Sequence, residues 1–138
     1  MSLNSISPID GRYAKYTKDL VPYFSDSASM KYKIITEGEY LIALSGGKNV
    51  NLRNFSDKEK KIIRNLYNLS EKDAGIINQI ELKGYKNIKA TDHDTKAVEY
   101  FMKEKLAKTS LKDVLEWIHF GLTSEDTINL AYALMLSD

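Results

Sequence analysis

The chain has 138 residues, and its 43% hydrophobic and 28% charged residues indicate a folded globular domain rather than a disordered or fibrous chain. Twenty basic against nineteen acidic residues leave a formal charge of +1, which excludes a general attraction to nucleic acid or anionic lipid. The absence of cysteine excludes disulfides and thiolate ligands and fits a reducing compartment, so we expect the cytoplasm. No secretory signal or membrane-spanning apolar run is visible, so no membrane partner is expected.

The first predicted element is a helix over residues 27–44. Both prolines, Pro8 and Pro22, lie within residues 1–26, which we expect to be largely loop. Beyond them, apolar residues recur at helical spacing, and a glycine pair at 46–47 provides a stop signal. The apolar positions are Met30, Ile34, Ile35, Leu41 and Ile42.

Two serines predict the next helix starts. Ser56 and Glu59 have the spacing of a capping box, and Ser70 has the character of a second cap before a helix that Gly84 ends. These two helices could also be one bent helix. The basic residues along the first of them are expected to form a solvated face: Lys58, Lys60, Lys61 and Arg64.

Three more helices are expected, beginning at about Asp94, after a Ser110 cap, and at Ser124. The last of them is apolar almost all round, which suits a helix surrounded by others and indicates truncation or assembly with further subunits. No convincing alternating strand pattern occurs, so the predicted fold class is all-α.

The first candidate site is the segment SPIDGRY, residues 7–13. Its Arg12 guanidinium could hold a phosphate or carboxylate through two parallel hydrogen bonds, next to the phenol of Tyr13. Because exposed arginines are common, an ordinary turn with a surface ion pair is the favoured reading from local physics alone.

The second candidate is TDHDTKAVEY, residues 91–100, in which His93 lies between Asp92 and Asp94. A carboxylate could fix the imidazole tautomer and raise the imidazole's affinity for a proton. The alternative is that Asp94 caps a helix and His93 is a surface residue. Three consecutive residues cannot easily converge on one ion and no second ligand cluster exists, so no metal is expected.

The third candidate is TSEDTINL, residues 123–130. Thr123 and Ser124 stand at a predicted helix start, whose unpaired amides and partial positive charge favour an anion. The same residues are expected of a plain helix cap, with Ser124 as the cap, so local physics leaves the ligand open. His119, just upstream, is expected on a helix as a semi-buried histidine with one backbone partner.

Taken together, SPIDGRY, TDHDTKAVEYFMKEKL and EWIHFGLTSEDTINLAYALML resemble the amino-terminal region of the adenylosuccinate lyase family, particularly its bacterial-type branch, within the fumarase/aspartase superfamily. The resemblance is specific at residues 7–13 and 91–136, and it implies the helical amino-terminal domain of that lyase fold. Residues 1–122 would form this domain, and residues 123–138 would begin the central helical bundle, where the chain is expected to be truncated.

The resemblance implies a C–N lyase of purine biosynthesis, specifically AMP biosynthesis. It would remove fumarate from adenylosuccinate and from the succinyl-aminoimidazole-carboxamide ribonucleotide, without a cofactor. Family sites combine residues from three subunits of a homotetramer, so other subunits are implied partners. The histidine and serine regarded as principal acid and base lie outside this chain, which alone is expected to be inactive.

Seven residues match the family's substrate-contacting positions. Arg12 and Tyr13 would contact the nucleotide, and Thr123 and Ser124 would hold a carboxylate of the succinyl group. The remaining three match one substrate-contacting triplet, in which His93 would have an auxiliary catalytic role: Asp92, His93 and Asp94. The sequence departs from the family at Asp92, where asparagine is usual. An acid at this position would repel an anionic substrate unless it is protonated or paired with a cation.

Two alternatives stay open at this point. The chain could be a noncatalytic helical interaction module on the same scaffold, or part of another superfamily lyase such as argininosuccinate lyase. The segments DGRY and HDTKAVEY argue against the latter.

Overall fold

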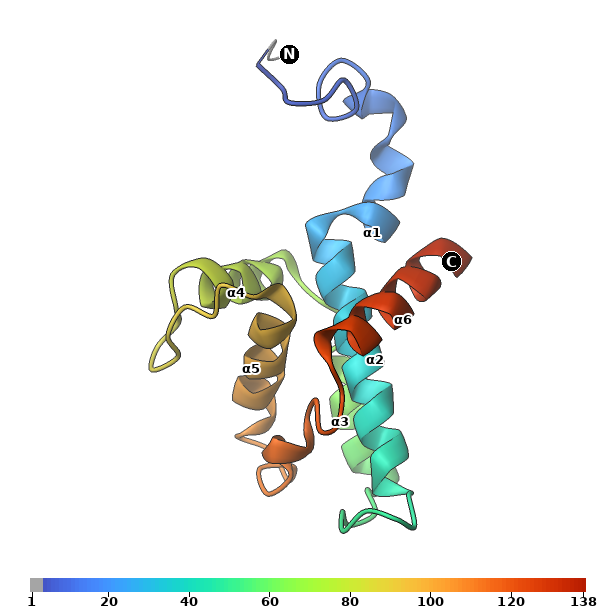
Figure 1. The fold of residues 1–138 in the computed structure, drawn as a ribbon, viewed down its shortest axis with the longest axis vertical. Coiled ribbons are helices and arrows are strands. Elements are labelled where there is room, and N and C mark those ends of the chain that lie inside the picture. The colour runs from blue at the N-terminus through green and yellow to red at the C-terminus, as the bar shows by residue number, and fades with distance from the viewer. Residues whose placement is uncertain (1–3) are drawn as a thin grey trace.

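The computed structural model describes residues 4–138, in which helices are joined by turns and loops (Figure 1). Within that range the only extended pairing is a single antiparallel bridge between Tyr85 and Ile88, so the predicted all-α class is confirmed. The α-helices are α1 (Val21–Phe24), α2 (Asp26–Ser45), α3 (Asp57–Asn65), α4 (Glu71–Leu82), α5 (Asp94–Leu106) and α6 (Ser124–Ser137). None of these helices is long and apolar enough to cross a membrane.

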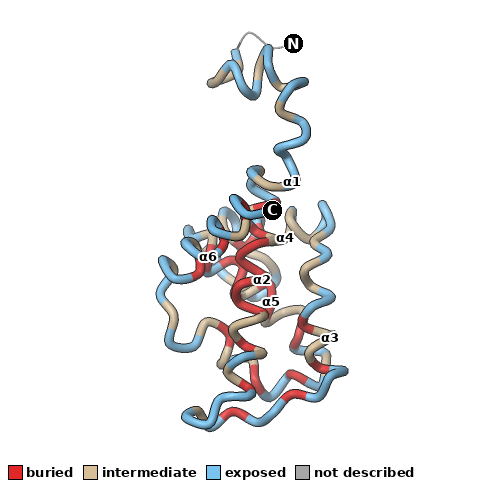
Figure 2. The backbone as a smooth tube through the Cα atoms, turned by 90° about the vertical axis from the view of Figure 1, so that its right-hand side faces the viewer, coloured by how far each residue is buried: buried red, intermediate tan, exposed pale blue. Residues whose placement is uncertain are grey.

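Helix α2 is the central element, and α3, α4, α5 and α6 all pack against it (Figure 1). The hydroxyl of Ser25 caps its start by accepting from the amide of Ala28 at 3.2 Å, and it ends before Gly46, as the sequence predicts. Its inner stripe includes Ile34 and Leu41, which are fully buried in the main core. Burial is therefore concentrated along α2 and the helices beside it (Figure 2).

Helices α3 and α4 are separate, because each has its own side-chain cap. Ser56 and Glu59 form the predicted capping box at the start of α3, and the hydroxyl of Ser70 accepts from the amide of Asp73 at the start of α4. After α4, Gly84 adopts a φ of +84°, and a Cβ there would stand 2.7 Å from the carbonyl oxygen of Ile88. Glycine is thus required to turn the chain toward α5.

The helix predicted after Ser110 is not formed. Residues 111–118 follow turns and a short 3-10 helix, Leu115–Trp117, in which amides bond to the third residue before them, as Val114 does to Leu111. Apolar residues three apart then share a face without an α-helix, so Leu111 and Val114 are still buried. The chain leaves this segment through His119 and Gly121, both with positive φ.

Residues 4–24 extend away from the helical body (Figures 1 and 2). This segment is more structured than the predicted loop, since two 3-10 helices, Ala14–Tyr16 and Lys18–Leu20, precede α1. No residue of these three short helices is buried. Large apolar side chains lie exposed along the segment: Tyr13, Tyr16, Leu20, Val21 and Phe24.

Helix α6 crosses α2 and buries one face against it (Figure 1). Ala131 and Met135 form a small second core with Ala28 and Tyr32 of α2. Other apolar side chains of α6 are exposed in this chain, among them Leu130, Tyr132 and Leu136.

Candidate functional site

The structure brings two of the predicted motifs together where α5 and α6 begin. His93 caps α5, and its Nδ1 accepts from the amide of Lys96 at 3.4 Å. Its Nε2 lies 3.2 Å from the hydroxyl oxygen of Ser124 in the first turn of α6. Because Nδ1 accepts a hydrogen bond, the neutral ring carries its proton on Nε2 and donates it to Ser124. Thirty-one positions of sequence separate the two residues.

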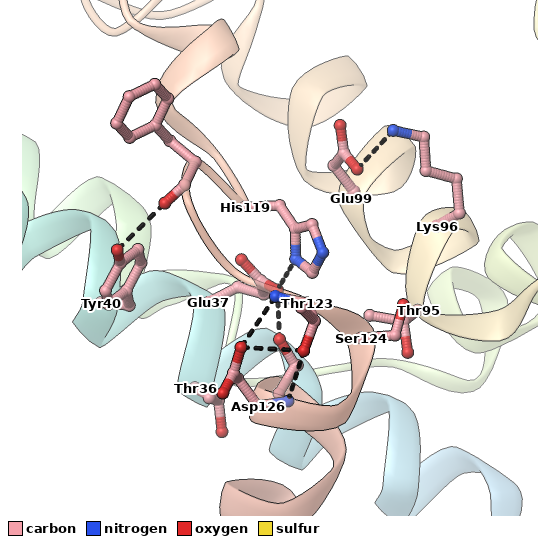
Figure 3. Close-up of polar contacts among 12 residues, drawn as sticks. Thr36, Glu37, Tyr40, Thr95, Lys96, Glu99, His119, Thr123, Ser124 and Asp126 are labelled. Atoms are coloured by element: carbon pink, nitrogen blue, oxygen red, sulfur yellow. Dashed lines mark hydrogen bonds and ion pairs between the residues drawn. The ribbon is translucent and has the colours of Figure 1, made fainter.

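The cap of α6 is Thr123, not Ser124 (Figure 3). The hydroxyl of Thr123 accepts from the amide of Asp126, and the carboxylate of Asp126 accepts from the amide of Thr123 at 2.8 Å. Hydrogen bonds from the backbone and hydroxyl of Thr123 lower the pKa of Asp126. This capping box uses the hydroxyl of Thr123 and leaves that of Ser124 for His93.

Asp94 is held by a lysine that the sequence does not single out. The ammonium of Lys33, a buried residue of α2, forms an ion pair with Asp94, whose other oxygen accepts from the amide of Thr95 at 2.6 Å. Burial alone would raise the pKa of Asp94, but the hydrogen bond and charge of Lys33, with the bonds from Thr95, lower it overall. The carboxylate therefore anchors the start of α5 to α2, and the alternative that Asp94 caps α5 is wrong.

Asp92 is exposed and adopts a φ of +48°, in the left-handed region. Its amide donates to the carbonyl of Glu81 at 3.0 Å, which ties this turn to the end of α4. Among residues 4–138 no lysine, arginine or histidine forms an ion pair with Asp92. The neighbouring cation that would offset its charge toward an anion is thus not provided by this part of the chain.

Arg12 and Tyr13 are not brought to the other site residues. They lie on the segment that projects from the helical body (Figure 1). Both are exposed, and the guanidinium of Arg12 stands 4.8 Å from the ring centroid of Tyr13. Both side chains are accessible to a ligand, but within one chain they do not reach a ligand bound at His93 and Ser124.

A buried polar cluster lies behind the start of α6. Glu37 of α2, fully buried, has its Oε1 at 2.6 Å from Nδ1 of His119, and the same oxygen accepts from the hydroxyl of Thr127 at 2.7 Å. Figure 3 shows the ring of His119 pointing toward Glu37. His119 thus has a carboxylate partner rather than the expected backbone partner, and it lies after a 3-10 helix rather than on a helix.

The sequence carries a signal for Glu37 that lies outside the three candidate motifs. Glu37 falls between Ile34 and Leu41 on the inward stripe of α2, so a charged residue stands where the helical period requires an apolar one. A buried charge needs a partner, which predicts a polar cluster without saying which residues complete it. Within residues 4–138, no group of three or more acidic or histidine side chains is placed to hold a metal ion.

Comparison with known proteins gives consistent matches along the whole chain. It is 40% identical to adenylosuccinate lyase of Legionella pneumophila (strain Corby) and 46% identical to that of Dictyostelium discoideum, in each case over 98% of this chain. Adenylosuccinate lyase of Haemophilus influenzae (strain ATCC 51907 / DSM 11121 / KW20 / Rd) is 38% identical over 99% of it. No family profile matches. The chain spans 29%, 28% and 29% of the length of these three relatives. The chain is therefore similar, along nearly its whole length, to one part of these adenylosuccinate lyases.

Proposed function

We propose that the chain is the amino-terminal part of an adenylosuccinate lyase and forms one wall of its substrate site. The observation that carries the proposal is the contact of 3.2 Å between His93 and Ser124, which unites the two longer motifs of the resemblance at the starts of α5 and α6. The reaction would be elimination of fumarate from adenylosuccinate, giving AMP, and from the succinyl-aminoimidazole-carboxamide ribonucleotide. The compartment we propose is the cytoplasm, which the cysteine-free composition supports.

In such an elimination a base takes the proton from the carbon beside one carboxylate. The electron pair of that C–H bond forms the new double bond as the C–N bond breaks, and an acid protonates the departing nitrogen. We assign the principal acid and base to the remainder of the enzyme. The role proposed for this chain is to hold the succinyl group, because carboxylate binding beside the reacting carbon stabilises the developing negative charge.

Ser124 is the strongest candidate for that carboxylate. Its hydroxyl is not used in capping, and it stands in the first turn of a fourteen-residue helix, where backbone amides favour an anion. His93, bonded to the same hydroxyl, can hydrogen-bond the reacting part of the substrate. Thr123 and Asp94 support this wall from behind, since their polar atoms already bond to Asp126 and Lys33.

We further propose that other subunits of a homotetramer complete the site. Leu130 and Leu136 on the outer face of α6 are 55% and 75% exposed, and burying such apolar area against another helix is favourable. Arg12 and Tyr13, on the projecting segment, would then contact the nucleotide of a site shared with another subunit. The guanidinium suits the nucleotide phosphate.

A chimera tests this function. Residues 1–138 replace the matching segment of the Haemophilus influenzae adenylosuccinate lyase, and fumarate release from adenylosuccinate is measured. We expect an active chimera and no release by the 138-residue chain alone. In the chimera, Ser124→Ala should raise KM by about tenfold, since a hydrogen bond to a charged group contributes roughly 1.5 kcal/mol.

The matched control is Ser137→Ala, which removes a serine hydroxyl bonded to the carbonyl of Leu134 at the far end of the same helix. Its KM should equal that of the parent chimera. A folded chimera without activity would overturn the assignment, and equal kinetics for the two serine variants would remove Ser124 from the substrate site.

A further inference from the structure

Glu37 is a fully buried ionisable residue for which the proposed reaction has no assigned role. It is 0% exposed, in the middle of the core-facing stripe of α2. Both of its hydrogen bonds go to one oxygen, Oε1, while Oε2 has no hydrogen-bond partner among the described residues. A carboxylate in this position costs stability relative to an apolar residue, so a purely structural role is poorly served by it.

His119 is held in an uncommon conformation opposite that carboxylate. Its φ of +63° lies in the left-handed region, which costs a non-glycine residue roughly 1–2 kcal/mol. This backbone places Nδ1 at 2.6 Å from Oε1 of Glu37 (Figure 3). The ring itself is not fully enclosed, since its side chain is 18% exposed.

A contact this short between a ring nitrogen and a carboxyl oxygen requires a proton between the two atoms, and an ionised Glu37 can only accept, which leaves that proton on the nitrogen. Thr127 occupies the same oxygen as a donor, so Oε1 accepts from both sides, and the carboxylate cannot turn without losing both bonds. His119 therefore keeps the proton on Nδ1 whether the ring is neutral or charged.

We infer that Glu37 is a positioning residue, which fixes the ring of His119 so that Nε2 is the nitrogen that exchanges a proton or hydrogen bond with a ligand at the start of α6. A buried carboxylate that sets a histidine tautomer from behind is a recurrent arrangement where the other nitrogen acts on a substrate. The location fits, because Thr127 ties the cluster to the first turn of α6, which also carries Ser124. The identification of the ligand as the substrate rests on the proposed function, whereas the assignment of the His119 tautomer rests on the contact with Glu37 alone.

The two histidines are predicted to have opposite neutral tautomers. His93 accepts at Nδ1 and so carries its proton on Nε2, whereas His119 carries its proton on Nδ1. The full 138-residue chain contains only these two histidines, so ring-nitrogen NMR of the 15N-histidine-labelled chain resolves both. At a pH where both rings are neutral, we expect a protonated Nδ1 in His119 and a protonated Nε2 in His93.

Glu37→Gln supplies the perturbation, because a neutral amide can either accept from Nδ1–H or donate to Nδ1. We expect the His119 signals to shift toward a mixture of tautomers while those of His93 stay unchanged. Glu99→Gln is the matched control: Glu99 is 4% exposed, but it pairs with Lys96 and Lys103 rather than with a histidine. It should leave both histidines as in the parent chain.

An unprotonated Nδ1 in parent His119 would overturn the inference, as would identical His119 spectra for Glu37→Gln and the parent. If Glu37→Gln does not fold, Thr127→Val replaces it, since loss of the second donor should leave the proton on Nδ1 of His119. These spectra need no enzymatic activity, so an inactive chimera would contradict the proposed function and leave this assignment standing.

Discussion

At the scale of single residues, Asp92 combines an unusual backbone with an unfavourable charge. Its φ of +48° suits glycine, asparagine and aspartate best, because short polar side chains tolerate the left-handed region. The backbone therefore accepts either aspartate or the asparagine that the family resemblance leads one to expect. Only the charge distinguishes them, and it faces solvent one residue before His93.

We predict that Asp92→Asn in the chimera lowers KM for adenylosuccinate by about two- to fivefold at low salt, because it removes roughly 0.5–1 kcal/mol of repulsion from an anion. The gain should shrink as salt is added. Asp57→Asn, at a fully exposed acid of α3, is the control and should not change KM. An unchanged KM for Asp92→Asn at low salt would show that position 92 does not face the substrate.

At the scale of elements, the start of α6 divides two roles between adjacent hydroxyls. The hydroxyl of Thr123 is committed to the capping box with Asp126, while that of Ser124 contacts His93. A helix start can thus be stabilised and still present a hydroxyl and backbone amides outward.

This division predicts different losses of stability. Thr123→Val should lower the free energy of unfolding by about 1 kcal/mol, since Val cannot cap, whereas Thr123→Ser should retain it. Ser124→Ala should change it by less than about 0.5 kcal/mol. Urea unfolding of the 138-residue chain measures all three. A larger loss for Ser124→Ala than for Thr123→Val would make Ser124 the cap.

At the scale of the whole molecule, Arg53 joins segments distant in sequence. Its guanidinium donates to Glu59 of α3 at 2.8 Å, to Asp113 at 2.7 Å and to the carbonyl of Ser110 at 3.1 Å. The hydrogen bond from Arg53, helped by the amide of Ser56 and opposed by burial, lowers the pKa of Glu59 to about 2. The irregular segment after α5 is thereby fixed to the start of α3.

The lowered pKa makes stability depend on pH in acid. Glu59 binds a proton more readily in the unfolded chain, so its contribution is complete above a pH of about 4.5 and is lost as pH falls toward about 2. We expect Glu59→Gln to be less stable than the parent by about 1–2 kcal/mol at pH 7, after allowance for the exposure of Arg53.

That difference in the free energy of unfolding should narrow between pH 4.5 and pH 2, in urea titrations across this range. Glu71→Gln, at an exposed acid in the first turn of α4, is the control for the loss of a carboxylate to which Arg53 does not donate. A difference that is constant with pH would mean that Arg53 does not hold Glu59 ionised.

The sequence by itself determined the features that depend on residues three or four apart. The capping box at Ser56, the cap at Ser70, the extent of α2 and the inward apolar positions follow from local hydrogen bonds and periodicity. Motif resemblance likewise selected the segments around His93 and Ser124. The α-helix predicted after Ser110 does not form, because turns and a 3-10 helix bury apolar residues three positions apart, such as Leu111 and Val114, equally well.

Only the tertiary structure decided which polar groups meet. Lys33 and Asp94 are 61 positions apart, His119 and Glu37 are 82 apart, and Thr127 and Glu37 are 90 apart. Such pairs form because helix packing removes their groups from water, and a buried polar group must then bond to whatever the packing places beside it. The sequence therefore shows that Glu37 is a charged residue at an apolar position of α2. The packing of α2 against α6 and the segment before it decides that the partners of Glu37 are His119 and Thr127.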